Sequence, residues 1–276
     1  MKKSILAAIT VIICLLALNI AVINIVAKKP TVTSTIASTS QITDTQHQLG
    51  QNQNVSNANI QNELKLKRKT VYLTFDDGPN KKWTPTILSI LAANHVKATF
   101  FVVGTAIEKN PELLEREKRE GHAFGNHSYD HIYREIYASP QAYIDSLKKN
   151  DALLKSKNIT TFVTRPPGGH RLDPETKKWL RENHMKSILW NLWTGDGDKI
   201  AHDSQFLVDT TQSGLSNLED RDMNQVVVLM HDGLAGVPRN SKIYKDMSIT
   251  READLEALPI IIRMFKQNGY TFEVLK

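Results

Sequence analysis

Short apolar runs alternate with longer amphipathic segments from residue 69 to the end of the chain. The apolar runs are rich in β-branched and aromatic residues, which predicts strands at 70–75, 97–103, 161–163, 186–190, 226–230 and 270–275. The segments between them begin with helix-start signals such as Thr84-Pro85, with threonine as the cap and proline at the first helical position. They predict helices at 84–94, 111–120, 139–157, 173–183, 203–218 and 249–267.

Strands that alternate with helices in this way are typical of a parallel sheet with helices outside it. The run 226–230 is apolar at every position, as expected for a strand buried on both faces. Polar residues gather directly after the strand ends, where the active sites of β/α barrels lie. We therefore predict an α/β domain of six or seven parallel strands with its site at their carboxyl ends.

The first 67 residues have a different texture. Two lysines precede 24 uncharged residues, Ser4–Ala27, and Lys28-Lys29 follow. A helix of that length spans about 36 Å, enough to cross a bilayer. This apolar segment is longer than that of a cleaved signal peptide, and Ile25-Val26-Ala27 is a poor cleavage site. We therefore predict that residues 1–29 are a membrane anchor. A cleaved secretion signal is the alternative.

Residues 30–67 are rich in Ser, Thr, Gln and Asn, which predicts a flexible linker between the anchor and a domain at 68–276. The protein is therefore expected outside the cytoplasm, held at a membrane. The net charge of +6 includes six lysines and two acidic residues of the first 67, which leaves +2 for the domain and gives no indication of nucleic-acid binding. We expect a monomer.

The single cysteine, Cys14, lies in the apolar leader. Disulfides, thiolate metal sites and a cysteine nucleophile are thus excluded from residues 68–276.

The most informative residues are two aspartates and two histidines. Asp76-Asp77 end a predicted strand, and His127 and His131 are four residues apart, so both imidazoles would reach one ion if they lay on a helical turn. Adjacent carboxylates repel each other, but a metal removes that penalty, since one aspartate can bind it and the other can stay beside it as a base. Taken singly, the aspartates could instead form a solvated turn and the histidines could be surface residues.

Three further strand-end residues allow two interpretations each. His231 could be a general acid or a core histidine, since its pKa lies near neutrality. Arg165 could clamp a catalytic carboxylate or brace its loop. Asp196 could orient His231 or only shape the turn at Gly195-Asp196-Gly197. We interpret the other histidines of the domain as surface or structural residues: His95, His122, His170, His184 and His202.

These segments, in this order, resemble the polysaccharide deacetylases of carbohydrate esterase family four, the NodB-homology domain. The resemblance covers residues 68–276 and rests on four motifs, namely Thr74-Phe75-Asp76-Asp77-Gly78-Pro79, His127-Ser128-x-x-His131, Arg165-Pro166-Pro167-Gly168-Gly169 and Leu229-Met230-His231. The first two motifs, about 50 residues apart, form a highly specific pair.

The resemblance implies a distorted (β/α)7 barrel and a role for each motif residue. Asp77, His127 and His131 would bind one divalent metal, with zinc expected and cobalt, nickel or iron also suited to these ligands. Asp76 would be the general base and His231 the general acid. Arg165 would hold Asp76, Asp196 would assist His231, and Leu229 would face the acetyl methyl group. A backbone N–H near Pro167-Gly168 would bind the oxyanion.

Two positions depart from the family pattern. The family usually has an aromatic residue where this chain has Gly168, and a tryptophan where it has Gly197. Both aromatics would wall the sugar groove, and we consider Trp190 and Trp193 as replacements.

The expected activity is hydrolysis of N-acetyl groups on an amino-sugar polymer. Location outside a membrane favours the N-acetylglucosamine of peptidoglycan, ahead of N-acetylmuramic acid, chitin-like oligomers and exopolysaccharide. The two missing aromatics leave a catalytically weakened glycan-binding module of the same fold as an alternative. Two histidines and a carboxylate also occur in non-haem iron oxygenases, but the alternating α/β pattern argues against that class.

Overall fold

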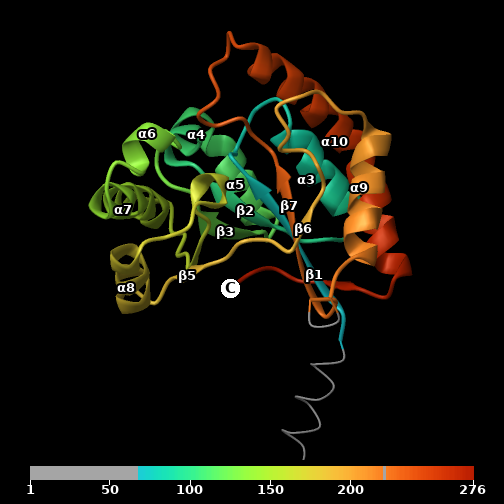
Figure 1. Ribbon diagram of the computed structural model, residues 1–276, viewed down its shortest axis with the longest axis horizontal. Helices are drawn as coiled ribbons and strands as arrows, with labels where there is room; N and C mark the ends of the chain where they lie inside the picture. The colour runs from blue at the N-terminus through green and yellow to red at the C-terminus, as the bar shows by residue number, and fades with distance from the viewer. Residues whose placement is uncertain (1–67, 220–221) are drawn as a thin grey trace, which may run out of the picture. The chain divides into compact units, whose positions relative to one another are not determined.

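The computed structural model of the protein describes residues 68–219 and 222–276 (Figure 1). The predicted anchor at 1–29 and linker at 30–67 lie outside these described residues. Within 68–219 and 222–276, no helix has the length and apolar character that a membrane crossing requires.

The centre of the domain is a sheet of eight strands in which every pairing is parallel. Along the sheet the order is β5-β4-β3-β2-β1-β7-β6, and β8 also pairs with β1. In chain order the strands are β1 (Thr70–Asp76), β2 (Thr99–Val102), β3 (Ala123–Asn126), β4 (Val163–Thr164), β5 (Lys186–Ser187), β6 (Leu192–Trp193), β7 (Gln225–His231) and β8 (Thr271–Phe272).

Helices surround the strands, with α3, α9 and α10 on one side of Figure 1 and α4 to α8 on the other. Their bounds are α3 (Thr84–Ala93), α4 (Gly104–Lys109), α5 (Pro111–Arg119), α6 (Tyr133–Ile136), α7 (Pro140–Ser156), α8 (Pro174–Glu182), α9 (Ser204–Ser216) and α10 (Lys242–Gln267), with a short 3-10 turn, η1, at Pro167–Gly169. Ser139, Asp173, Asp203 and Ser241 cap the first turns of α7, α8, α9 and α10 through their side chains.

Among the described residues, the end strands β5 and β6 each pair with one neighbour and not with each other. The sheet is therefore a half-barrel of parallel strands, which agrees with the expected (β/α)7 fold. The central pair runs in register from Thr70 opposite Gln225 to Asp76 opposite His231.

The main core lies between this sheet and its helices. Leu73 and Phe75 of β1 and Val228 and Met230 of β7 are fully buried, and Phe75 stacks on Phe100 of β2 with ring centroids 5.2 Å apart. Strands buried on both faces have continuous apolar sequences, which agrees with the unbroken apolar run at 226–230 in β7.

Several sequence predictions were wrong in detail. Strand β3, with the sequence Ala-Phe-Gly-Asn, and strand β6 were missed because both are short and β3 contains poor strand formers. Thr84 does not cap α3. Trp83 holds that position, and the Thr84 hydroxyl instead donates to the Asp232 carboxylate. Helix α10 begins at Lys242, seven residues before the predicted start at 249.

Candidate active site

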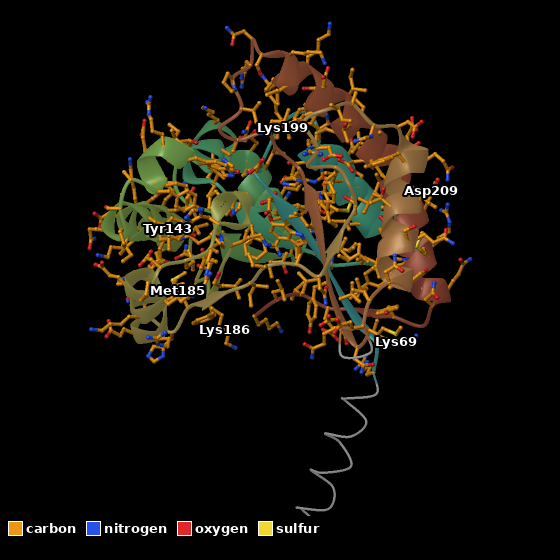
Figure 2. The ribbon with its side chains drawn as sticks, in the orientation of Figure 1. Lys69, Tyr143, Met185, Lys186, Lys199 and Asp209 are labelled. Carbon is orange, nitrogen blue, oxygen red and sulfur yellow. The ribbon has the colours of Figure 1, made fainter. Side chains whose placement is uncertain are left out.

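The predicted site residues meet at the carboxyl ends of the strands. Asp76 and His231 are the last residues of β1 and β7 and are paired in register. A cavity of about 480 Å³ opens beside them. Figure 2 places Lys199, which lines this cavity, at the end of the domain opposite to Lys69, the residue before β1.

Asp77, His127 and His131 form a buried cluster whose ligand atoms all lie within 4.8 Å of one another. Asp77 Oδ1 is 3.1 Å from His131 Nε2 and 3.5 Å from His127 Nε2. Despite these distances, Asp77 Oδ1 has no hydrogen-bond partner among the described residues. A buried carboxylate oxygen without a partner is costly, and a cation between these three atoms would remove that cost.

His127 has the tautomer that a metal ligand needs. Its Nδ1 lies 2.7 Å from the backbone oxygen of Arg165, and because a carbonyl only accepts, Nδ1 carries the proton and donates. Nε2 is therefore the unprotonated nitrogen and faces Asp77. A backbone carbonyl that orients a histidine in this way is a usual feature of metal sites.

The loop that carries the histidines is not helical, so the predicted helical turn is wrong. Ser128 and His131 have positive φ values of 68° and 61°, which interrupts any helix between His127 and Tyr133. Two side-chain contacts hold the loop: the Ser128 N–H donates to Asn126 Oδ1, and the His131 N–H donates to Ser128 Oγ. The two imidazoles nonetheless meet, with ring centroids 5.0 Å apart.

Two of the three ligand residues lie in the left-handed region of backbone space. Asp77 has a φ of 77° and His131 a φ of 61°. Non-glycine residues in that region cost of order 1–3 kcal/mol each and concentrate at functional sites. Their coincidence in one cluster supports a metal-binding role for the loop.

The electrostatic environment favours the protonation states that a divalent cation requires. Burial opposes ionisation of Asp77, but the adjacent imidazoles of His131 and His127 outweigh it and hold the Asp77 pKa well below its ordinary value. Burial also lowers the pKa of His131, against the opposing charge of Asp77. The residues present therefore fit a divalent metal, whose identity the ligand set alone does not define.

Arg165 contacts Asp76, the other aspartate of the pair, as the resemblance implies. Its Nη1 donates to Asp76 Oδ1 at 2.8 Å and to Thr74 Oγ1 at 2.7 Å. Its Nε and Nη2 donate to the carbonyls of Ile188 and Leu189. The guanidinium is fully buried and lies over the Phe101 ring, so it cannot swing away from Asp76.

His231 and Asp196 also meet, as predicted. Asp196 Oδ2 accepts the backbone N–H of His231 at 2.7 Å, and both carboxylate oxygens lie 3.1 Å from His231 Nδ1. Burial alone would lower the pKa of His231, but the charge and hydrogen bond of Asp196 raise it to about 9. The imidazole is therefore protonated at neutral pH, and its Nε2 remains as the proton-donating atom.

Sequence reasoning missed the pair Arg251 and Asp254 behind Asp196. Arg251 Nη1 donates to the backbone oxygen and carboxylate of Asp196 and to Asp254 Oδ2, at 2.9 to 3.1 Å. All three side chains are buried. Arg251 lies in the middle of α10, where nothing in the local sequence distinguishes it from an exposed helical arginine.

Asp232 is a second residue that sequence reasoning left without a role. Its carboxylate is fully buried, and it accepts a hydrogen bond from Thr84 and contacts Gly78, so it supports the turn that follows Asp77. Burial, opposed by the Thr84 hydrogen bond and reinforced by Asp77 and Asp76, raises the pKa of Asp232 to about 7.

The predicted substrate-binding residues lie at different depths. Leu229, Gly168, Trp190 and Trp193 line the cavity. Pro167 does not line it. It is buried beside the cavity, and its carbonyl accepts the Tyr137 hydroxyl. The cavity also includes Tyr133, which the sequence analysis did not single out.

Comparison with known proteins agrees with this geometry. The sequence model of the polysaccharide deacetylase family matches residues 63–188. A peptidoglycan-N-acetylglucosamine deacetylase of Bacillus cereus is 31% identical over 214 residues, which cover 75% of this chain and 69% of that protein. The peptidoglycan-N-acetylmuramic acid deacetylase PdaA of Bacillus subtilis is 30% identical over 215 residues, 75% of this chain and 70% of that protein.

A solved structure shows the same likeness. A carbohydrate esterase family four (CE4) esterase of Streptococcus mutans superposes with a TM-score of 0.65 at 33% identity, covering 78% of this chain and 89% of that one. The chain therefore belongs to the polysaccharide deacetylase family, and the resemblance drawn from its motifs is confirmed. Members of this family are hydrolytic N-deacetylases.

Proposed function

We propose that this protein is a metal-dependent N-deacetylase of cell-wall peptidoglycan that acts on N-acetylglucosamine and releases acetate. The observation that carries the proposal is the buried, unpartnered Oδ1 of Asp77 between the Nε2 atoms of two histidines. Relatives named for peptidoglycan deacetylation support the choice of polymer. The PdaA likeness makes N-acetylmuramic acid the competing sugar.

Asp77, His127 and His131 would hold the cation, and two nitrogens with one oxygen suit zinc. When bound, the metal polarises the acetamide carbonyl and lowers the pKa of water. Proton transfer and substrate orientation are then carried out by groups of the protein itself, which surround the metal ligands.

Asp76 acts as the general base. Arg165 holds Oδ1 of Asp76 at 2.8 Å, and Asp76 Oδ2 lies 3.7 Å from His127 Nε2, next to the metal ligands. A carboxylate fixed in this position accepts a proton from the attacking water as the C–O bond forms. The buried arginine keeps it oriented without the need for substrate.

His231 acts as the general acid. Its Nδ1–H is held by Asp196, so the proton on Nε2 can pass to the amine nitrogen as the C–N bond breaks. An unprotonated amine anion is a very poor leaving group, so this transfer is necessary. The register that pairs His231 with Asp76 on adjacent strands supports these two roles.

A backbone N–H binds the developing oxyanion. The Gly169 N–H donates to the Pro166 carbonyl at 2.9 Å, and Pro167 has no N–H. We assign the oxyanion contact to the remaining N–H of this turn, that of Gly168. Leu229 is buried and lines the cavity, and it would face the acetyl methyl group.

The proposed function includes a location outside the membrane, which the N-terminal sequence supports. The apolar run at 4–27, outside the described residues, supports export and membrane attachment, which would bring the domain to the cell wall.

Acetate release tests the proposal. The purified protein is freed of metal with a chelator, reloaded with Zn²⁺, and incubated with peptidoglycan and with chitooligomers. We expect acetate only after reloading, and from peptidoglycan more rapidly. An Asp76→Asn variant should bind Zn²⁺ and glycan but release no acetate. The absence of release from every amino-sugar polymer by the zinc-loaded protein would contradict the proposal and favour a glycan-binding module.

A further inference from the structure

The two glycines in the cavity leave space that other side chains fill. Gly168 has a φ of 66°, and a Cβ placed on it would come within 2.6 Å of Tyr133 Oη and 3.1 Å of Tyr133 Cζ. The tip of Tyr133 therefore occupies the volume into which a side chain at position 168 would project.

On the other side of the cavity, Gly197 is next to a tryptophan. A Cβ on Gly197 would lie 3.1 Å from His231 Cε1 and 3.4 Å from Trp193 Nε1. Trp193 is at the end of β6, beyond β7, whereas Tyr133 and Gly168 follow β3 and β4 on the opposite side of β1 (Figure 1). The ends of β1 and β7, with Asp76 and His231, lie between the two aromatic residues.

Tyr133 is held firmly in its position. Its ring lies 5.2 Å from the His131 ring and 6.0 Å from the Tyr137 ring, measured between centroids. Tyr137 in turn donates a hydrogen bond to the Pro167 carbonyl at 2.8 Å and stacks on His170 at 4.1 Å. These contacts fasten α6 to the turn that contains Gly168, so Tyr133 is preorganised before substrate arrives.

Tyr133 also remains available to a ligand. About half of the residue, 49%, is exposed, and it lines the cavity. A tyrosine phenol keeps its proton at neutral pH and can donate its O–H. An exposed aromatic face with a polar tip suits a sugar ring, which presents C–H groups and hydroxyls.

We propose that Tyr133 is a specificity-determining residue that forms one wall of the subsite for the sugar ring, opposite Trp193. The ring stacks on the pyranose, and the hydroxyl donates to a sugar oxygen. This inference rests on the proposed function. On the Gly168 side of the cavity, the sugar would thus be recognised by Tyr133, which follows the metal-binding loop, because Gly168 has no side chain to do so.

The test compares a substrate that has a sugar ring with one that lacks it. Tyr133→Ala and Tyr133→Phe are assayed with zinc bound on chitotetraose and on 4-nitrophenyl acetate, and the zinc content of each variant is measured. We expect Tyr133→Ala to raise KM for chitotetraose about tenfold and to lower kcat less, as loss of a ground-state contact does. Tyr133→Phe should show an intermediate KM, since it keeps the stacking face.

Two control variants match these changes outside the cavity. Phe162→Ala removes a ring that is 55% exposed, and Tyr72→Phe removes a hydroxyl from a half-buried tyrosine, and neither residue lines the cavity. Both should keep the wild-type KM. An unchanged KM in Tyr133→Ala would overturn the proposal. Equal losses on both substrates, or lost zinc, would also overturn it, because Tyr133 would then act through His131.

A double-mutant cycle tests the shared volume. Gly168→Ala should raise KM in the presence of Tyr133 and add little to Tyr133→Ala, although backbone strain at position 168 is the same in both backgrounds. Additive effects would contradict the contact. If the wild-type protein deacetylates no amino sugar, the proposed function fails. The affinity for chitotetraose, measured by calorimetry on wild type and Tyr133→Ala, then tests the sugar contact of Tyr133 independently of activity.

Discussion

The carboxylate of Asp196 accepts both the backbone N–H and the ring Nδ1–H of His231. This double contact fixes the imidazole in position and raises its pKa to about 9 against the effect of burial. A general acid must carry its proton when the leaving group departs, so this contact controls the alkaline limit of activity.

Asp196→Asn is expected to shift that limit. Without the negative charge the pKa of His231 falls, and the alkaline limb of kcat/KM moves to lower pH. At the wild-type optimum, we expect a loss of about 10²-fold or more. The check is a pH profile of acetate release by zinc-loaded wild type and variant. An unchanged alkaline limb would show that another group donates the proton.

Arg165→Lys should separate orientation from charge. Lysine keeps a cation near Asp76 but cannot make the four donor contacts of the buried guanidinium. We expect kcat to fall by about 10- to 100-fold with bound zinc unchanged, because Asp76 stays charged and loses its fixed position. Arg171→Lys, at an exposed arginine nearby in sequence, should have wild-type kinetics. A wild-type kcat in Arg165→Lys would refute the clamp.

Zinc should stabilise the fold as well as support activity. Binding to the native state alone at a free concentration 100 times the dissociation constant adds about 2.7 kcal/mol to the free energy of unfolding. Asp77→Asn should abolish this increment, since it removes the anionic ligand from the cluster. Urea unfolding with and without Zn²⁺ measures both. A zinc increment that survives in Asp77→Asn would place the ion elsewhere.

Asp232 predicts a pH dependence of stability in the metal-free protein. Its folded pKa of about 7 exceeds the ordinary value of 3.8, so its stabilising contribution is complete below pH 3.8. The contribution is lost as pH rises toward 7, because the unfolded chain releases the proton first. Asp232→Asn should match wild type near pH 4 and be more stable above pH 7. Urea titrations at both pH values decide this, and equal stability at pH 8 would refute it.

The parts of the site that follow strand ends could be predicted from the sequence. Asp76-Asp77 and His231 directly follow the predicted strands 70–75 and 226–230, and parallel strands bring their carboxyl ends to one edge. The residues alone left the roles of Arg165 and Asp196 open between two interpretations each, and the family resemblance selected the contacts with Asp76 and His231, which join distant segments.

Other features could not be predicted for physical reasons. The loop from His127 to His131 depends on positive φ at Ser128 and His131, which no periodicity reveals. Tyr133 and Arg251 are ordinary residues in sequence, and their importance arises from contacts with Gly168 and Asp196, 35 and 55 residues away. Such long-range contacts override local propensity and leave no local pattern.

The pairing of Asp76 with His231 in the β1–β7 ladder has a consequence for how tolerant the enzyme can be to change. A single inserted or deleted residue in either strand would turn one of the two proton-handling side chains to the opposite face of the sheet. The loops that surround the cavity can vary in length without disturbing this spacing. New sugar preferences can therefore arise by changes in the loops around the cavity, while the fixed register of the two strands preserves the reaction.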